Sequence, residues 1–194
     1  MPISRRNLIL GGLAASSLPG LLVACSSDAT LAPTPACGDA GITPAQIEGP
    51  FFTSGSPTRA DLAADVTSDT RLALAGTVLT TGCQPVPGAK LDFWQADEDG
   101  EYDNGGFRLR GHVFADDQGR YAITTVVPGL YPGRTRHLHV TVQPPAGGRL
   151  TTQLYFPGEA SNQSDGFYRR ECELAMDSSD GATQRATFTF VLAG

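Results

Sequence analysis

Two histidines separated by one residue are the clearest chemical signal in the chain. His137 and His139 flank Leu138 in the segment RTRHLHV, whose polar and apolar residues alternate as they do in a strand. On a strand, residues i and i+2 point to the same face and lie about 7 Å apart along the chain. The two imidazoles can therefore converge on one metal ion, while Leu138 points to the opposite face. The alternative is a pair of half-exposed strand histidines that bind nothing, although the chain has only 3 histidines.

Two loop tyrosines indicate which kind of metal would fit. Tyr102 follows the sequence DGE, and Tyr131 lies in the sequence PGLYP. Both lie close to glycines in loops, where a buried core tyrosine is not expected. Phenolate oxygens are hard anionic donors, and with imidazoles they suit a hard trivalent ion better than zinc. No cysteine lies near these residues in the sequence, which excludes a zinc finger or an iron–sulfur cluster.

Strands and turns must position these four side chains, because the composition leaves little room for long helices. The 194 residues include 23 Gly and 14 Pro, a content typical of many short strands joined by turns. Strand-like alternation covers residues 71–80, 89–96, 111–115, 120–126, 136–143, 150–156 and 186–192. The predicted fold class is all-β: an antiparallel β-sandwich with long loops and little helix.

Two pairs of these segments are expected to form hairpins. Residues 111–115 and 120–126 flank the turn sequence DDQG, and residues 136–143 and 150–156 flank PPAGG. Residues 157–183 are too polar and too rich in Gly and Asp to be assigned to an element.

The length predicts one domain that is large enough to bury a core. The pattern of turns from Gly76 to Gly129 resembles the prealbumin-like modules appended to many secreted proteins, which usually act as binding or spacer domains. That reading explains the turns without any chemistry. A prealbumin-like cell-surface binding or spacer module without turnover therefore stays open as an alternative function.

The first residues are typical of an export signal. Arg5 and Arg6 form a twin-arginine pattern, and residues 8–24 are apolar or small and interrupted by glycine and proline. The segment closes with LVAC, which resembles the lipidation site of bacterial lipoproteins and makes Cys25 the lipidated first residue of the mature chain. We expect an exported lipoprotein anchored to a membrane of the bacterial cell envelope or surface. The predicted divisions are a signal peptide at 1–24, the lipidated cysteine and a flexible tether at 25–40, and the globular domain at 41–194.

The charge and the remaining cysteines limit the partners and the crosslinks. The formal net charge is −6, and no basic tract follows Arg6, so nucleic acid is not an expected partner. With Cys25 lipidated, Cys37, Cys83 and Cys172 remain, and an oxidising compartment permits one disulfide and one free thiol among them. The sequence leaves the pairing open.

Eight motifs follow one another in a fixed order. They are EGPFF at 48–52, AKLDFWQAD at 89–97, GEY at 100–102, FRLRG at 107–111, DQGRY at 117–121, PGLY at 128–131, RTRHLH at 134–139 and LTTQLYF at 150–156. Together they resemble the intradiol ring-cleavage dioxygenases, which include catechol 1,2-dioxygenases and protocatechuate 3,4-dioxygenases. The order and spacing are more specific than any single motif, and the resemblance covers residues 43–160.

This resemblance implies a cofactor and a reaction. The implied cofactor is a non-haem Fe(III), whose ligands by position are Tyr102, Tyr131, His137 and His139. The resemblance also implies that Arg134 and Gln153 lie beside the metal as catalytic residues, and that Tyr131 leaves the metal when substrate binds and helps to accept a proton. The implied reaction inserts O2 between the two hydroxylated carbons of a catechol-type aromatic and gives a cis,cis-muconate-type product.

Some features depart from the family or leave alternatives open. The chain carries a tether where catechol-specific members carry a long helical segment used in dimerisation, so neither the oligomeric state nor the particular catechol is predicted. Phe51-Phe52 occupies a motif that often ends in tyrosine, which favours a more apolar pocket rim. Two roles stay open for four further side chains: they can bind a carboxylate of the substrate, or they can be purely structural residues of their strands. These side chains are Arg108, Arg110, Arg136 and His112, and for His112 the structural role is favoured.

Overall fold

The computed structural model of the chain describes residues 41–177 and 183–193. The signal peptide predicted for residues 1–24, the lipidated Cys25 and the tether up to residue 40 lie outside these residues. Across the described ranges, no helix is both long enough and apolar enough to cross a membrane.

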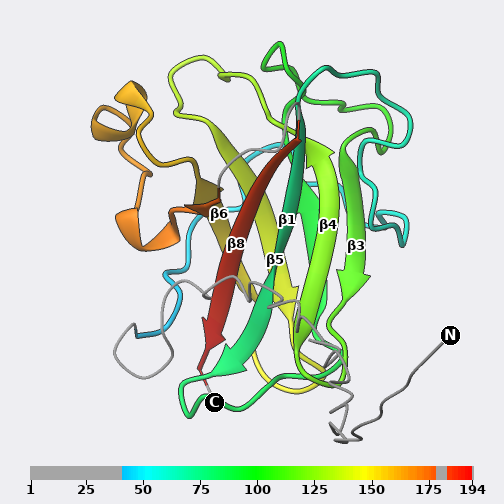
Figure 1. The fold of residues 1–194 in the computed structure, drawn as a ribbon, viewed down its shortest axis with the longest axis vertical. Helices are drawn as coiled ribbons and strands as arrows, with labels where there is room; N and C mark the ends of the chain where they lie inside the picture. Colours follow the sequence, from blue (N-terminus) through cyan, green and yellow to red (C-terminus); the bar gives the residue numbers. More distant parts are fainter. Residues whose placement is uncertain (1–40, 178–182, 194) are drawn as a thin grey trace, which may run out of the picture. The chain divides into compact units, whose positions relative to one another are not determined.

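The described residues form eight strands and two one-turn 3-10 helices (Figure 1). In chain order they are β1 Arg71–Thr80, β2 Lys90–Trp94, β3 Arg110–Phe114, β4 Arg120–Val126, β5 His137–Gln143, β6 Leu150–Tyr155, η1 Ala160–Gln163, η2 Arg170–Cys172, β7 Ala175–Met176 and β8 Thr183–Leu192. The prediction of a mostly β chain with little helix is confirmed. The short elements η1, η2 and β7 lie in the stretch that the sequence left unassigned.

The strands form two four-stranded sheets, with the orders β4-β1-β8-β7 and β3-β2-β5-β6 (Figure 1). One pair of neighbours is parallel: β1 runs alongside β8 from the Arg71–Thr183 pair to the Thr80–Leu192 pair. The prediction of an antiparallel arrangement is wrong at this pair. Parallel neighbours cannot be joined by a tight turn, and here every strand of the second sheet lies between β1 and β8 in the chain.

The predicted hairpin of residues 111–115 and 120–126 is also wrong, because β3 and β4 belong to different sheets. The turn itself forms around the carboxylate of Asp116, which accepts hydrogen bonds from two backbone N–H groups of the turn. Beyond the turn, β3 pairs with β2 and β4 pairs with β1. The predicted pairing of residues 136–143 with 150–156 is confirmed, since β5 and β6 are antiparallel neighbours.

Side chains from both sheets contribute to one buried hydrophobic cluster. Leu74 of β1, Phe93 of β2 and Leu138 of β5 all belong to it. Six of the seven residues of β5 are buried, so this strand is covered on both faces. Leu138 faces the hydrophobic cluster, and the buried neighbours His137 and His139 alternate with it along the strand.

The described cysteines differ in their chemical state. Cys83 is disulfide-bonded, whereas Cys172 is a buried free thiol. The side chain of Gln46 donates a hydrogen bond to the Cys172 sulfur at 3.6 Å. Among the cysteines that the structure describes, Cys172 is therefore the free thiol.

Candidate metal centre

Strand β5 brings the two histidines together as their spacing predicts. The Nε2 atoms of His137 and His139 lie 3.2 Å apart. Both side chains are buried, with 4% and 3% of their surfaces exposed. The ring of His139 stacks on the ring of Trp94 at a centroid distance of 4.9 Å, which limits the orientations open to this imidazole.

Both imidazoles are neutral and can act as ligands. The Nδ1 atom of His137 donates to the carbonyl oxygen of Thr135 at 2.6 Å, which leaves Nε2 as the unprotonated nitrogen. Burial lowers the pKa of His137 to about 4 and outweighs the Thr135 hydrogen bond, which acts in the opposite direction. Burial also lowers the pKa of His139, and the proximity of His137 and of the Arg134 guanidinium lowers it further. A neutral imidazole is the form that binds a metal ion.

The two tyrosines complete a compact group of donors. The hydroxyl of Tyr102 lies 3.2 Å from Nε2 of His137. The ring of Tyr131 meets the ring of Tyr102 edge-on, with 5.8 Å between the centroids. The ring of Phe51 stacks on the ring of Tyr102 at a centroid distance of 4.4 Å. Burial raises the pKa of Tyr102, and the nearby cations Arg134 and Arg110 act against this rise. A metal ion would provide the additional positive charge that a buried phenolate needs.

Two glycines allow the tyrosine loops to approach each other. A Cβ atom on Gly100 would lie 2.4 Å from the carbonyl oxygen of Leu130, and one on Gly129 would lie 2.2 Å from that of Glu98. Gly100 also has a φ of +86°, which side chains rarely adopt. The loop before Tyr102 and the loop before Tyr131 therefore pack backbone against backbone.

The predicted ligands surround a cavity of about 140 Å³. Its lining residues are Ile47, Gly49, Pro50, Phe51, Tyr102, Tyr131, Arg134, His137, His139 and Phe167. The structure thus brings together Tyr102, Tyr131, Arg134, His137 and His139. The remaining predicted residue, Gln153, is fully buried and lies behind Arg134 rather than in the cavity wall.

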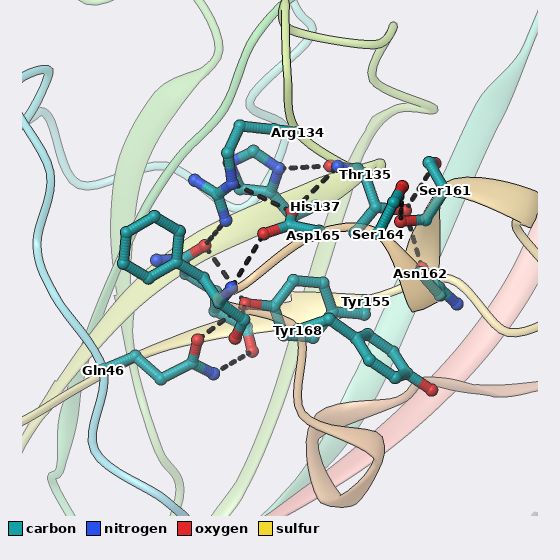
Figure 2. A network of polar contacts seen from close by, with 12 residues as sticks. Gln46, Arg134, Thr135, His137, Tyr155, Ser161, Asn162, Ser164, Asp165 and Tyr168 are labelled. Atoms are coloured by element: carbon teal, nitrogen blue, oxygen red, sulfur yellow. Dashed lines mark hydrogen bonds and ion pairs between the residues drawn. The ribbon is translucent and has the colours of Figure 1, made fainter.

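Arg134 is held in place from two sides. Its Nε atom donates to the carboxylate of Asp165 at 2.9 Å (Figure 2). Its Nη2 atom donates to Oε1 of Gln153 at 2.5 Å. The backbone N–H groups of Thr135 and Phe167 also donate to Asp165. Burial alone would raise the pKa of Asp165, but these amides and the guanidinium hold it below its usual value. The carboxylate therefore stays ionised and balances the charge of Arg134.

Sequence reasoning missed two members of this polar network. Asp165 lies in the polar segment 157–183, where no local pattern distinguishes it from other aspartates. The hydroxyl of Tyr155 lies 2.6 Å from Oε1 of Gln46 (Figure 2) and 2.8 Å from the backbone carbonyl oxygen of Phe167, and it donates its one hydrogen to either acceptor. Tyr155 belongs to the motif LTTQLYF and lies two residues after Gln153, so on a strand both side chains are expected on the same face. This spacing was the available signal for Tyr155.

The donor set fits a hard metal ion. Within residues 41–177 and 183–193, no three His, Cys, Asp or Glu side chains gather where they could hold a metal, so tyrosine oxygens would be needed. Lone pairs on Nε2 of His137 and His139 would repel each other at 3.2 Å unless a proton or a cation lay between them. Nδ1 of His139 is buried and has no hydrogen-bond partner among the described residues, which is unfavourable for a polar atom. Two imidazoles with phenolate oxygens suit a hard trivalent cation.

Comparison with known proteins identifies a family. The model of the Dioxygenase_C family, described as "Dioxygenase", matches residues 47–194. The chain belongs to this dioxygenase family. It is similar to the dioxygenase domain of a dioxygenase–carbohydrate-binding fusion protein from Streptomyces sp. SirexAA-E, with 46% sequence identity and a TM-score of 0.76. That match covers 79% of this chain and 99% of the other chain.

Curated members of the dioxygenase family match more distantly. Catechol 1,2-dioxygenase from Acinetobacter baylyi is 27% identical over an alignment of 172 residues, and the match covers 73% of this chain and 55% of the relative. Hydroxyquinol 1,2-dioxygenase from Nocardioides simplex is 31% identical over an alignment of 147 residues, and the match covers 63% of this chain and 49% of the relative. The chain thus spans about half the length of the curated relatives it matches. The prediction that the chain belongs to the family of the intradiol dioxygenases is confirmed.

Proposed function

We propose that this chain is a non-haem Fe(III)-dependent intradiol dioxygenase that acts on catechol-type aromatics. The observation that carries the proposal is the convergence of two neutral imidazoles, His137 and His139, with the oxygen of Tyr102 on a cavity that Tyr131 also lines. The names of the relatives, catechol 1,2-dioxygenase and hydroxyquinol 1,2-dioxygenase, support an aromatic substrate with adjacent hydroxyl groups.

The proposed reaction adds both atoms of O2 to the substrate and breaks the ring bond between the two hydroxylated carbons. Catechol then becomes cis,cis-muconic acid, which keeps every carbon, hydrogen and oxygen atom of the catechol and gains both atoms of O2. The atoms and electrons therefore balance without a further reductant. Bound Fe(III) would supply the activation of the catechol toward O2.

The residues of the chain would bind the metal ion, accept a proton and stabilise negative charge. His137, His139, Tyr102 and Tyr131 would hold the metal ion. The phenolate of Tyr131 would accept a proton from an incoming catechol hydroxyl. The guanidinium of Arg134 carries its charge at any working pH and is already oriented, so it would stabilise negative charge that develops on the substrate.

The proposal is tested on the purified protein by its iron content, its visible spectrum and its O2 uptake with catechol. We expect bound iron, the red-brown colour of tyrosinate bound to Fe(III), and a muconate product. Each of the variants Tyr102→Phe, His137→Ala and His139→Ala should lose iron or the visible band, because each removes one donor. Tyr131→Phe should keep more iron but turn over poorly. Full iron and full colour in the first three variants would remove the ligand assignment.

The alternative of a prealbumin-like binding or spacer module makes the opposite prediction. Such a module has no use for O2, so an iron-loaded protein that consumes none with any catechol would favour it. We also propose that the two sheets pack as a β-sandwich, because the main hydrophobic cluster contains side chains from both sheets.

We propose further that the chain is exported by the twin-arginine route and anchored through a lipid on Cys25. The support is the sequence of residues 4–8 and the segment LVAC. Replacing Arg5 and Arg6 with lysine should hold the precursor inside the cell. Cys25→Ala should release the domain from the membrane without altering its catalysis, and unchanged membrane attachment in this variant would refute lipidation.

A further inference from the structure

We infer that the substrate is an uncharged catechol whose ring carries an apolar group, and that Ile47, Phe167 and Leu130 contact this group at the mouth of the cavity. The inference rests on the proposed function and adds the class of substrate to it. The sequence left open whether a cationic side chain binds a substrate carboxylate, and the positions of these side chains in the structure argue against it.

The size of the cavity limits what can lie inside it. Its volume is about 140 Å³, and a protein cavity of about 150 Å³ holds benzene. The space therefore admits one ring and little more. If the two hydroxyl groups point toward Tyr102, His137 and His139, the opposite edge of the ring points away from them. A substituent on that edge must leave the cavity and lie against the lining residues that are exposed to solvent.

The cavity wall offers no unpaired cation to such a substituent. Among the described residues that line the cavity, Arg134 is the one arginine or lysine, and its ion pair with Asp165 has an N–O distance of 2.9 Å. The two lining histidines are the proposed metal ligands, so their ring nitrogens are not available to a substituent. An ionised carboxylate entering here would lose water without gaining a new cation as partner, which is unfavourable.

The other candidates for carboxylate binding are occupied elsewhere, and none of them lines the cavity. Arg108 pairs with Asp97 at 3.0 Å, Arg136 pairs with Glu159 at 2.9 Å, Arg110 donates to the backbone carbonyls of Phe51 and Asp103, and His112 bonds to Ser56 and Thr58. These partners explain the arginines and His112 as structural residues. The formal net charge of −6 adds a weak repulsion of anionic substrates.

The mouth of the cavity is instead apolar. Ile47 and Phe167 line the cavity and are 50% and 42% exposed. Leu130, which is 50% exposed, lines an adjoining pocket that shares Tyr131 and Arg134 with the cavity. Large apolar side chains gathered around a concave site mark a binding surface. An alkyl or aryl group on the catechol ring would cover these apolar side chains, and both the group and the side chains would then be removed from water.

The ring of Phe167 is held at this position by its neighbours. The guanidinium carbon of Arg134 lies 4.7 Å from the ring centroid. The backbone N–H of Phe167 donates to Asp165, and its carbonyl accepts from Tyr155. The part of the apolar surface that Phe167 forms is therefore preorganised for the substrate.

The first test compares three substrates on the iron-loaded wild type. O2 uptake gives kcat/KM for catechol, for 4-tert-butylcatechol and for protocatechuate, which carries a carboxylate at the same ring position. We expect 4-tert-butylcatechol to match or exceed catechol and protocatechuate to fall below both by about 10²-fold. Calorimetric titration without O2 should give dissociation constants in the same order, independently of turnover.

The second test changes the apolar side chains. Ile47→Ser and Phe167→Ala should each lower the ratio of kcat/KM for 4-tert-butylcatechol to that for catechol by about 10-fold. Ile42→Ser and Phe114→Ala are matched controls, because Ile42 and Phe114 are at least as exposed as Ile47 and Phe167, at 53% and 55%, and lie outside the cavity wall. Both controls should keep the wild-type ratio. Ile47→Arg places a cation at the mouth and should raise turnover of protocatechuate relative to catechol.

The outcomes separate this inference from the proposed function. Absence of O2 uptake with every catechol would refute the function. Uptake in which protocatechuate equals or exceeds 4-tert-butylcatechol would overturn only the substrate class. Equal losses on both catechols in the Ile47→Ser variant would likewise overturn the assigned contact, because a residue that touches only the substituent must change the ratio.

Discussion

Replacing Asp165 with asparagine tests whether the ion pair behind the cavity serves catalysis or only stability. The substitution keeps the shape of the side chain and removes its charge. The carboxylate accepts three hydrogen bonds at 2.9 Å, from Nε of Arg134 and from the backbone N–H groups of Thr135 and Phe167. Asparagine offers one acceptor oxygen and one NH2 group, so at least one of these three donors must face another donor.

The magnitude follows from this geometry. A hydrogen bond to a charged group contributes about 1.5–3 kcal/mol. The side chain of Asp165 is 1% exposed and that of Arg134 is 15% exposed, so water can only partly replace the lost partner. We expect the free energy of unfolding of Asp165→Asn to fall by about 2 kcal/mol. If Arg134 also loses its orientation, kcat should fall by about 10²-fold, the scale for one oriented charge-stabilising group.

The assay measures urea unfolding and O2 uptake with catechol, at matched iron content. Asp116→Asn is the control, because the Asp116 carboxylate also accepts from two backbone N–H groups and one arginine Nε but lies in the exposed turn between β3 and β4. The control should keep full turnover. If Asp165→Asn is less stable yet turns over catechol at the wild-type rate, the ion pair is structural and the positioning role is wrong.

The same carboxylate predicts a pH dependence of stability. The folded-state pKa of Asp165 lies below its usual value. Its contribution is therefore fully present above the unfolded-state pKa of about 4 and is lost as the pH falls through the folded-state pKa. The difference in unfolding free energy between wild type and Asp165→Asn should be constant near neutral pH and shrink in acid. A difference that does not change with acidification would contradict this assignment.

Three further predictions concern the surroundings of the cavity. Arg134→Leu should keep iron and colour but lower turnover by about 10²-fold. Gln153→Ala should lower turnover less, because it removes a neutral group. Wild-type O2 uptake in the Arg134→Leu variant would contradict a catalytic role for Arg134. Gly129→Ala should separate the tyrosine loops and lower iron content, because its Cβ would lie 2.2 Å from a carbonyl oxygen, whereas Gly166→Ala, with no atom within 4 Å, should bind iron normally. Burial raises the pKa of the Cys172 thiol, so iodoacetamide should label it only after unfolding, and mass spectrometry of the native protein would reveal any earlier labelling.

Local periodicity explains why part of the site could be predicted. The i, i+2 spacing of His137 and His139 alone implies that both face one side of a strand, and the structure has their Nε2 atoms 3.2 Å apart. The alternation also implies that Leu138 faces the core, where it belongs to the main hydrophobic cluster. A period of two residues is a property of the strand itself, so no knowledge of distant contacts is needed.

Pairings between distant segments could not be predicted in the same way. The turn between β3 and β4 has the composition of a hairpin, yet the two strands bond to β2 and β1 in different sheets. A turn sequence determines how the backbone reverses over a few residues, whereas the neighbours of a strand depend on which hydrophobic faces are covered. The parallel pairing of β1 with β8 is set by the whole intervening chain. Asp165 was missed for a related reason, because its partner Arg134 lies 31 residues earlier in the sequence.

The charges around the cavity account for a donor set that includes tyrosine. Arg134 and Asp165 balance each other, and the buried histidines are neutral, so neither pair offers negative charge to a cation. Burying a cation without compensating charge is costly, and carboxylates do not gather here among the described residues. The phenol oxygens of Tyr102 and Tyr131 are then the remaining groups in the cavity wall that can become anionic. Two phenolates leave one unit of charge on a trivalent ion, which one further anion can balance. A catechol that gives one proton to Tyr131 and loses the other would replace one phenolate and this further anion without changing the total charge, whereas an additional carboxylate on its ring would exceed the balance and would lie unpaired at an apolar mouth.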